Sequence, residues 1–220
     1  MSKAGEVVLL DFWASPFCLR ARVALEEKGV AYESREENLL GGKSDLLLSS
    51  NPIHRKVPVL LHNGLPVLES SNIVAYVDEA WPSKPLLPTN PYERAQARFW
   101  ADYIDKTVFE TGKGIWLSKG AEEREAAVKN LIEVVKNLEG ALGDKDFFGG
   151  DAFGYVDIIA MGPASWFYAY EEIGGFKLED HCPKFSSWMQ RCLQRPSIAK
   201  TYPDPEKVHQ LVVKLSEIMG

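Results

Sequence analysis

The stretch Val7-Val8-Leu9-Leu10-Asp11-Phe12, followed closely by Ser15-Pro16-Phe17-Cys18, decides the fold of this chain. The first six residues are mostly apolar, as expected of a strand that is buried on both faces of a sheet. Ser15 is a good helix N-cap and Pro16 suits the first helical position, so a helix is expected to follow and to end at Gly29. The second stretch also resembles a redox motif whose first cysteine is replaced by serine. A serine cannot carry out redox chemistry there, but its hydroxyl can donate a hydrogen bond to a thiolate that arrives on a ligand.

Apolar runs and turn signals mark the elements that follow the first helix. Asn63-Gly64 is a hairpin signal between two short apolar runs. The expected elements are strands at residues 30–36, 57–61 and 66–68, a short helix within residues 38–51, and a helix from Ser70 or Ser71 to about Ala80. The order β-α-β, a connection, then β-β-α is that of a thioredoxin-like domain.

The segment from Trp81 to Pro88 contains three prolines and reads as a linker between two domains. Beyond it the strand signals disappear, and apolar residues recur with helical spacing between glycine and proline breaks. The expected helices lie at residues 91–112, 122–142, 156–170, 183–194 and 205–219. The sequence therefore predicts an α/β thioredoxin-like domain at residues 1–82, a linker at residues 83–92 and an all-α domain at residues 93–220.

Composition and charge exclude several classes of protein. The formal charge of −6 over 220 residues argues against nucleic-acid or anionic-membrane partners, which favour a basic surface. Three widely spaced cysteines do not make a disulfide framework, and no cysteine or histidine spacing resembles a metal site. The first six residues lack an apolar signal core, and no apolar run approaches the roughly 20 residues of a membrane span. A soluble, cytoplasmic protein is expected.

Four motifs together resemble a plant glutathione S-transferase of the tau class. They are Ser-Pro-Phe-Cys-Leu-Arg at residues 15–20, Asn-Pro-Ile-His-Arg-Lys-Val-Pro-Val-Leu at 51–60, Leu-Glu-Ser-Ser at 68–71, and Phe-Phe-Gly-Gly-Asp-Ala-Phe-Gly-Tyr-Val-Asp at 147–157. The resemblance extends over essentially the whole chain. It implies the cytosolic glutathione transferase architecture, with a glutathione-binding N-terminal domain, a helical domain for the electrophile, a homodimer, and glutathione as co-substrate without a further cofactor.

The resemblance makes Ser15 the catalytic residue, which would hold the glutathione sulfur as a thiolate. From the residues alone, a Ser-Pro pair at a helix start is more often only a cap. Cys18 stands at the resolving position of a redox pair, but as a lone cysteine on the helix inner face it is expected to be a buried small hydrophobe. Asp157 has capping-box spacing from Gly154, so its expected role is in folding.

Glutathione carries two carboxylates and one ammonium group, so its site needs donors at two places and an acid at a third. Glu69 can meet the ammonium group, and Ser70 can offer its hydroxyl and a backbone N–H to the neighbouring carboxylate. The resemblance places Lys43 and Lys56 near the glycine carboxylate, although either could be ordinary surface charge. It also implies that Val57 precedes a cis-proline and pairs with the glutathione backbone.

The second substrate would lie against aromatic residues, and the family pattern suggests Phe12, Phe17, Phe109, Trp116 and Trp166. Aromatic stripes are usually core, so Phe12 and Trp166 remain open as packing residues. Phe109 and Trp116 are the firmer candidates, because they flank an expected helix break at Gly112-Lys113-Gly114. The four histidines show no metal or triad spacing.

The predicted function is conjugation of the glutathione thiolate to hydrophobic electrophiles, in detoxification and stress response, with reduction of organic hydroperoxides as a side activity. One alternative is a ligandin, a carrier that binds porphyrins, flavonoids or hormones without turning them over. Another is a thiol transferase or dehydroascorbate reductase, but these enzymes use a cysteine where this chain has Ser15.

Overall fold

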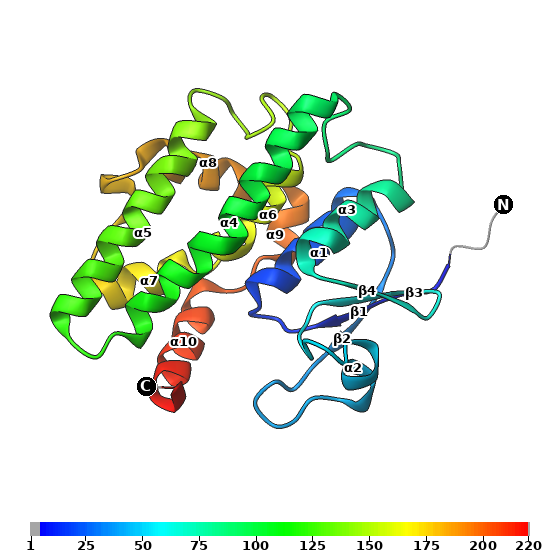
Figure 1. Ribbon diagram of the computed structural model, residues 1–220, viewed down its shortest axis with the longest axis horizontal. Helices are drawn as coiled ribbons and strands as arrows, with labels where there is room; N and C mark the ends of the chain where they lie inside the picture. Colours follow the sequence, from blue (N-terminus) through cyan, green and yellow to red (C-terminus); the bar gives the residue numbers. More distant parts are fainter. Residues whose placement is uncertain (1–4, 220) are drawn as a thin grey trace.

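A computed structural model describes residues 5–219, and it places a small sheet with its helices beside a larger group of helices (Figure 1). The predicted outer domain limits, residues 1 and 220, lie outside the described residues. Residues 81–90 connect the last helix of the first group to the first helix of the second. Within the described residues, no helix is both long and apolar enough to cross a membrane.

The first group is built on a four-stranded sheet of order β2-β1-β3-β4. β2 pairs with β1 in parallel, whereas the β1–β3 and β3–β4 pairs are antiparallel. Leu9 of β1 stands opposite Ser34 on one side and Leu60 on the other. The strands are β1 Val7–Asp11, β2 Glu33–Glu36, β3 Val59–His62 and β4 Leu65–Leu68. The predicted thioredoxin-like order is confirmed.

Both faces of the sheet are covered, because residues of β1 alternate between two apolar clusters. Val7 and Leu9 belong to the main core, which also contains residues of α1 and α3. Val8 and Leu10 face a smaller cluster that includes Leu47 of α2. The prediction that the first strand is buried on both faces is confirmed. The helices are α1 Pro16–Glu27, α2 Asp45–Ser50 and α3 Ser70–Ala80.

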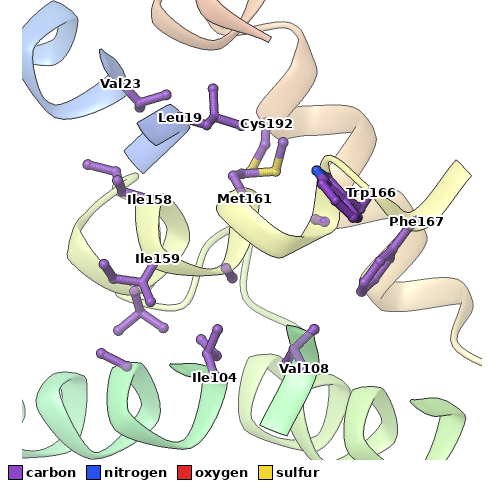
Figure 2. Close-up of a cluster of buried hydrophobic side chains, with 14 of the residues drawn as sticks. Leu19, Val23, Ile104, Val108, Ile158, Ile159, Met161, Trp166, Phe167 and Cys192 are labelled. Carbon is purple, nitrogen blue, oxygen red and sulfur yellow. The ribbon is translucent and has the colours of Figure 1, made fainter. Parts of the chain in front are cut away.

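The second group is all helical, as predicted. Its central helix, α6, lies between α1 of the sheet domain and α4, and their apolar side chains form one core (Figure 2). The elements are α4 Pro91–Leu117, α5 Ala121–Leu142, α6 Tyr155–Ala164, α7 Phe167–Gly174, the 3-10 turn η1 Leu178–Asp180, α8 Pro183–Leu193, α9 Pro196–Thr201 and α10 Pro205–Met219. The sequence did not predict the short elements η1 and α9.

The prediction of a single helix over residues 156–170 is wrong, because the structure has two helices there, α6 and α7. Pro163 lies inside α6 and has no N–H for the helical bond to the carbonyl of residue 159. The chain then tightens into a turn in which the Trp166 N–H donates to the Pro163 carbonyl at 3.0 Å. This break sets the position from which the Trp166 indole leaves the backbone.

The free Ile159 carbonyl and the missing side chain of Gly162 let α1 and α6 pack closely. Arg20 Nε donates to the Ile159 carbonyl at 3.0 Å, so the arginine replaces the donor that Pro163 lacks. A side chain on Gly162 would stand only 2.6 Å from the Pro16 carbonyl oxygen. The Gly162-Pro163 pair therefore creates both the space and the free acceptor for this contact between domains.

The expected helix break at Gly112-Lys113-Gly114 is also wrong, since α4 continues through it to Leu117. Gly112 serves packing instead. A Cβ atom there would stand 2.5 Å from Cζ of Tyr170, whose side chain in α7 is fully buried. Gly112 is therefore required where α4 meets α7, and not as a helix terminator.

Gly112→Ala is expected to lower the free energy of unfolding by about 1–3 kcal/mol, because the Tyr170 ring has no solvent-exposed space into which it can move. Gly114→Ala is the matched control two residues away. Its Cβ would meet only Ala127 at 3.4 Å, so the better helix propensity of alanine should stabilise the protein by up to about 1 kcal/mol. Thermal and urea unfolding of both variants measure the difference, and equal stabilities would contradict the packing role of Gly112.

Candidate functional site

Ser15 is the N-cap of α1, with extended backbone angles of φ −69° and ψ 122°. Its Oγ accepts a hydrogen bond from the Cys18 backbone N–H at 3.2 Å, and Pro16 occupies the first turn as predicted. The side chain is largely buried, with 9% of the residue exposed. Because the cap bond uses a lone pair of the oxygen, it does not consume the hydroxyl hydrogen. Capping and donation to a thiolate are therefore compatible at this one hydroxyl.

Cys18 is confirmed as a buried small hydrophobe. Burial raises the pKa of its thiol, an effect that the nearby Asp11 carboxylate reinforces. The thiolate is the reactive form of cysteine, so Cys18 is a poor nucleophile at neutral pH. This geometry argues against the thiol transferase alternative.

Ser70 is the first residue of α3, where the free N–H groups of a helix N-terminus favour an anion. The sequence favours Ser70 or Ser71 as the cap of this helix, but Glu69 occupies the N-cap position instead, with a positive φ of 67°. Ser70 Oγ accepts a hydrogen bond from Arg20 Nη1 at 3.0 Å, which leaves its hydrogen free to donate to a carboxylate. The Glu69 carboxylate is exposed and lies 3.8 Å from Nε2 of His54.

Arg20 organises the contact between this site and the helical domain. Its side chain is only 1% exposed and forms an ion pair with Asp105 of α4, which also accepts a hydrogen bond from the Ser71 hydroxyl. Burial lowers the pKa of the Arg20 guanidinium, and the Asp105 carboxylate opposes that effect. The buried Arg20 guanidinium, paired with Asp105, therefore holds the Ser70 oxygen in place.

The remaining predicted glutathione residues lie in the connection between β2 and β3. Lys43 and Lys56 are exposed, and Val57 is half-buried just before β3. The Lys56 carbonyl accepts a hydrogen bond from the Asn51 side chain at 3.0 Å, which orders the approach to β3. The Val57-Pro58 peptide bond is cis, as the resemblance implied.

Four of the five predicted aromatic residues form a continuous cluster between α1, α4 and the start of α7. The ring centroids of Phe17 and Phe109 lie 5.3 Å apart, and those of Phe109 and Trp166 also lie 5.3 Å apart. Trp116 lies 6.4 Å from Trp166. Phe12 instead pairs with Trp13, its neighbour in the chain. We call the set Phe17, Phe109, Trp116 and Trp166 the aromatic cluster.

Asp157 forms the predicted capping box. Its Oδ2 accepts from the Gly154 N–H at 2.9 Å, while its Oδ1 accepts from the Phe148 N–H at 3.0 Å and from Trp188 Nε1 at 2.8 Å. The side chain is fully buried, and burial raises the pKa of Asp157 to about 6 despite these three donors. Its place inside the helical domain supports a role in folding.

Two site residues, Arg20 and Asp105, were missed by the sequence analysis. The signal for the first lies in the run Leu19-Arg20-Ala21-Arg22-Val23, where arginines interrupt an apolar helix. A charged residue at such a position is buried only with a partner, so it indicates an ion pair. No local pattern marks Asp105, which is one acidic residue among several on α4.

Comparisons with known proteins agree with this fold. Family models described as "Glutathione S-transferase, N-terminal domain" and "Glutathione S-transferase, C-terminal domain" match residues 5–79 and 89–196. Glutathione S-transferase 3 of Glycine max is 54% identical over 217 residues, which cover 98% of each chain. Glutathione S-transferase U25 of Arabidopsis thaliana is 54% identical over 218 residues, or 99% of this chain and 98% of that one. The chain belongs to the glutathione S-transferase family.

Solved structures give the class within this family. Rice GST1 (OsGSTU1), solved in complex with glutathione, superposes with a TM-score of 0.95 at 46% identity over 100% of both chains. The tau-class enzyme of mango, Mangifera indica, gives a TM-score of 0.90 at 41% identity, covering 96% of this chain and 98% of that one. The chain is a tau-class glutathione S-transferase, as its four motifs predicted.

Proposed function

We propose that this glutathione S-transferase transfers the glutathione sulfur to apolar electrophiles, with the Ser15 hydroxyl stabilising the attacking thiolate. The observation that carries the proposal is the place of Ser15 at the N-terminus of α1, where its oxygen already accepts the cap bond from Cys18. A thiolate at that position receives a hydrogen bond from the hydroxyl and a favourable field from the helix dipole. Both interactions favour the thiolate over the thiol and lower the pKa of the bound sulfur.

The binding of glutathione would proceed through its charged groups. One carboxylate meets the Ser70 hydroxyl and the N-terminus of α3, and the ammonium group meets Glu69. Lys43 and Lys56 attract the glycine carboxylate, and the Val57 backbone pairs with the glutathione peptide. This arrangement leaves the sulfur as the reactive end of the bound molecule.

In the chemical step, the thiol proton passes to solvent and the sulfur attacks an electrophilic carbon held against the aromatic cluster. In a displacement the new C–S bond forms as the leaving group departs with its electron pair. In an addition the electron pair moves onto the acceptor, which then takes up a proton. Proximity of the two bound reactants supplies much of the acceleration.

Conjugation of glutathione to chlorodinitrobenzene by the purified protein tests this proposal. We expect protein-dependent formation of the conjugate, saturable in both substrates. Calorimetry should show that glutathione binds in the absence of an electrophile. Binding without conjugation of this or other electrophiles would favour the carrier alternative.

We further propose a role in detoxification and stress response in the cytoplasm. As a side activity, the enzyme would reduce an organic hydroperoxide to an alcohol with two molecules of glutathione. Glutathione disulfide and water would be the other products. The bound thiolate would attack the peroxide oxygen, and a second glutathione would resolve the resulting sulfenic acid. An assay of hydroperoxide-dependent glutathione oxidation tests this activity.

A homodimer is part of the proposal, and exposed aromatic residues on α4 support it. Tyr92 is 72% exposed and Phe99 is 56% exposed, although large apolar side chains are usually buried. In a twofold-symmetric interface the same residue of both subunits is buried, so one substitution changes the interface at two places. Phe99→Arg is therefore expected to raise the dimer dissociation constant by roughly a hundredfold or more.

Light scattering during gel filtration measures this effect as a change from dimer to monomer mass. The matched control is Ile218→Arg, which replaces a similarly exposed apolar residue, 63% accessible, on α10. We expect the control to remain dimeric. A dimeric Phe99→Arg variant would exclude this face of α4, and a monomeric wild type would exclude the dimer.

A further inference from the structure

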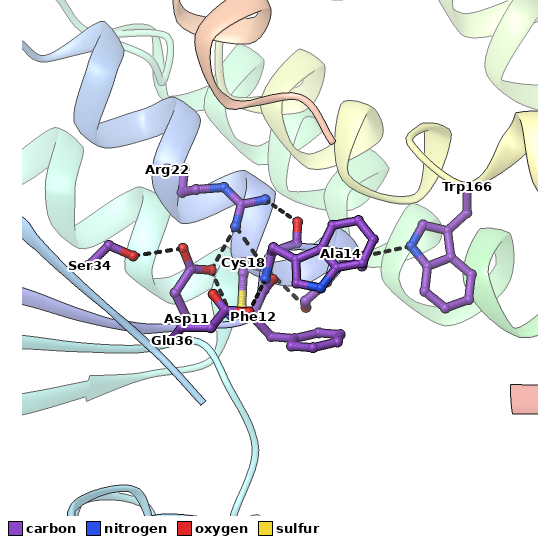
Figure 3. Close-up of polar contacts among 10 residues, drawn as sticks. Asp11, Phe12, Ala14, Cys18, Arg22, Ser34, Glu36 and Trp166 are labelled. Carbon is purple, nitrogen blue, oxygen red and sulfur yellow. Dashed lines mark hydrogen bonds and ion pairs between the residues drawn. The ribbon is translucent and has the colours of Figure 1, made fainter. Parts of the chain in front are cut away.

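The loop between β1 and α1, which presents Ser15, is held by charged side chains of its own domain (Figure 3). Arg22 Nη2 donates to the Trp13 carbonyl at 3.0 Å, and Arg22 Nη1 lies 2.7 Å from an oxygen of Asp11. Glu36 accepts from the Trp13 backbone N–H at 2.9 Å. β1, α1 and β2 therefore each contribute one charged residue that faces the loop.

One further hydrogen bond reaches this loop from the helical domain. Trp166 Nε1 donates to the Ala14 carbonyl at 2.8 Å, in a buried contact between residues 152 positions apart. Figure 3 shows the indole pointing at the loop from the opposite side to Arg22. The contact is the only place among residues 5–219 where a helical-domain side chain hydrogen-bonds the backbone of this loop.

The accepting carbonyl belongs to the peptide group that immediately precedes the Ser15 side chain. Because a peptide group is planar, the orientation of the Ala14 carbonyl also fixes the orientation of the Ser15 N–H. That N–H donates to the Phe12 carbonyl at 2.9 Å. The peptide plane is thus held at both ends, once by the loop and once by Trp166.

The Trp166 ring also belongs to the aromatic cluster, against which the electrophile is proposed to bind. Its centroid lies 5.3 Å from that of Phe109, and only 5% of the residue is exposed. One side chain therefore contacts the electrophile side of the site with its ring and the glutathione side with its N–H.

We propose that Trp166 is a positioning residue for Ser15: its indole N–H fixes the Ala14–Ser15 peptide group and so aims the Ser15 hydroxyl at the glutathione sulfur. The inference rests on the proposed catalytic role of Ser15. It assigns to Trp166 a function that neither packing nor contact with the electrophile requires.

Trp166→Phe tests this role, because it removes the N–H and keeps an aromatic ring. The primary readout is the pKa of the glutathione thiol bound to the protein without electrophile, followed by the ultraviolet absorbance of the thiolate. We expect this pKa to rise by about half to one pH unit, the equivalent of one net hydrogen bond. At pH values below the shifted pKa, kcat/KM should fall about threefold to tenfold, and the loss should shrink at higher pH.

Two matched controls carry the same substitution elsewhere. Trp116→Phe changes the same aromatic cluster, but the Trp116 indole N–H has no hydrogen-bond partner among the described residues. Trp188→Phe removes a buried indole N–H that donates to Asp157 at 2.8 Å within the helical domain. Both should leave the pKa of the bound thiol unchanged, and the second should lower thermal stability. Asp11, Arg22 and Glu36 are retained in all three variants, so their charges do not account for a difference.

An unchanged thiol pKa in Trp166→Phe, with a rise in Ser15→Ala, would overturn this inference and leave the role of Ser15 intact. An unchanged thiol pKa in both variants would overturn the role of Ser15 as well. A test on the wild type avoids any loss of folding in the variant. The indole ¹⁵N–H resonance of Trp166 should titrate with the bound thiol and only when glutathione is present, and its failure to do so would also overturn the inference.

Discussion

Ser15→Ala is expected to lower kcat for glutathione conjugation about a hundredfold while glutathione still binds. Loss of one hydrogen-bond donor from a preorganised anion-binding site lowers kcat by about 10²–10³. Other residues are proposed to bind the charged ends of glutathione, so the dissociation constant of glutathione should change by less than about threefold. The pKa of the bound thiol should rise toward the ordinary value of about 8.5.

The same substitution removes the N-cap of α1, so its effect on folding must be separated from its effect on the sulfur. Asn90→Ala is the matched control, because Asn90 caps α4 by accepting from the Tyr92 N–H at 2.9 Å and also precedes a proline. Both variants should lose about 1 kcal/mol of stability. Only Ser15→Ala should change the thiol pKa, and an equal kcat in Ser15→Ala and wild type would reduce Ser15 to a cap.

Asp157→Ala is expected to lower the free energy of unfolding by about 3–5 kcal/mol. The alanine leaves three donors without their acceptor, the N–H groups of Gly154 and Phe148 and the Trp188 indole, in the interior of the helical domain. Urea unfolding measures the loss, and the neighbouring exposed Asp151 supplies a control as Asp151→Ala. A loss below 1 kcal/mol in Asp157→Ala would show that the capping box does not stabilise α6.

The pH dependence of Asp157→Asn supplies an independent check. In the folded protein the pKa of Asp157 is raised by burial to about 6, above its unfolded value of about 3.9. The folded state therefore binds the proton more tightly, and this group makes stability fall as pH rises between about 4 and 6. Asparagine removes that contribution. The stability of the wild type should decline relative to Asp157→Asn by up to about 1.4 kcal/mol per pH unit in this window, and parallel pH profiles would contradict it.

Most of the fold could be predicted because its signals are local. The strand at Val7–Asp11 and the helix that starts after Ser15 each follow from residues within a few positions. The errors occur where tertiary contacts decide the outcome. Gly112 resembles a helix breaker until the Tyr170 ring, 58 positions along the chain, is seen packed against it.

The candidate site also contains both residues that the local sequence predicts and residues that only tertiary contacts reveal. Ser15, Glu69 and Ser70 stand at the starts of helices, so the free N–H groups of those helix N-termini and the neighbouring polar side chains can be predicted from sequence. The contacts of Arg20 with Ser70 and with Ile159 span 50 and 139 positions, and no local spacing reveals them. The role of Trp166 depends on a helix break that the apolar pattern does not show, because Pro163 lies within an otherwise continuous helical run.

The close packing of α1 on α6 limits which chimeras of this family can fold. An N-terminal domain with Arg20 requires a partner domain that supplies Asp105, a free carbonyl at residue 159 and a residue without a side chain at position 162. A helical domain with alanine at position 162 and a helix-forming residue at 163 would block the arginine and occupy its acceptor. Exchange of helical domains between paralogues is therefore governed by complementarity at the contact between α1 and α6, and the sequence of the linker is a secondary consideration.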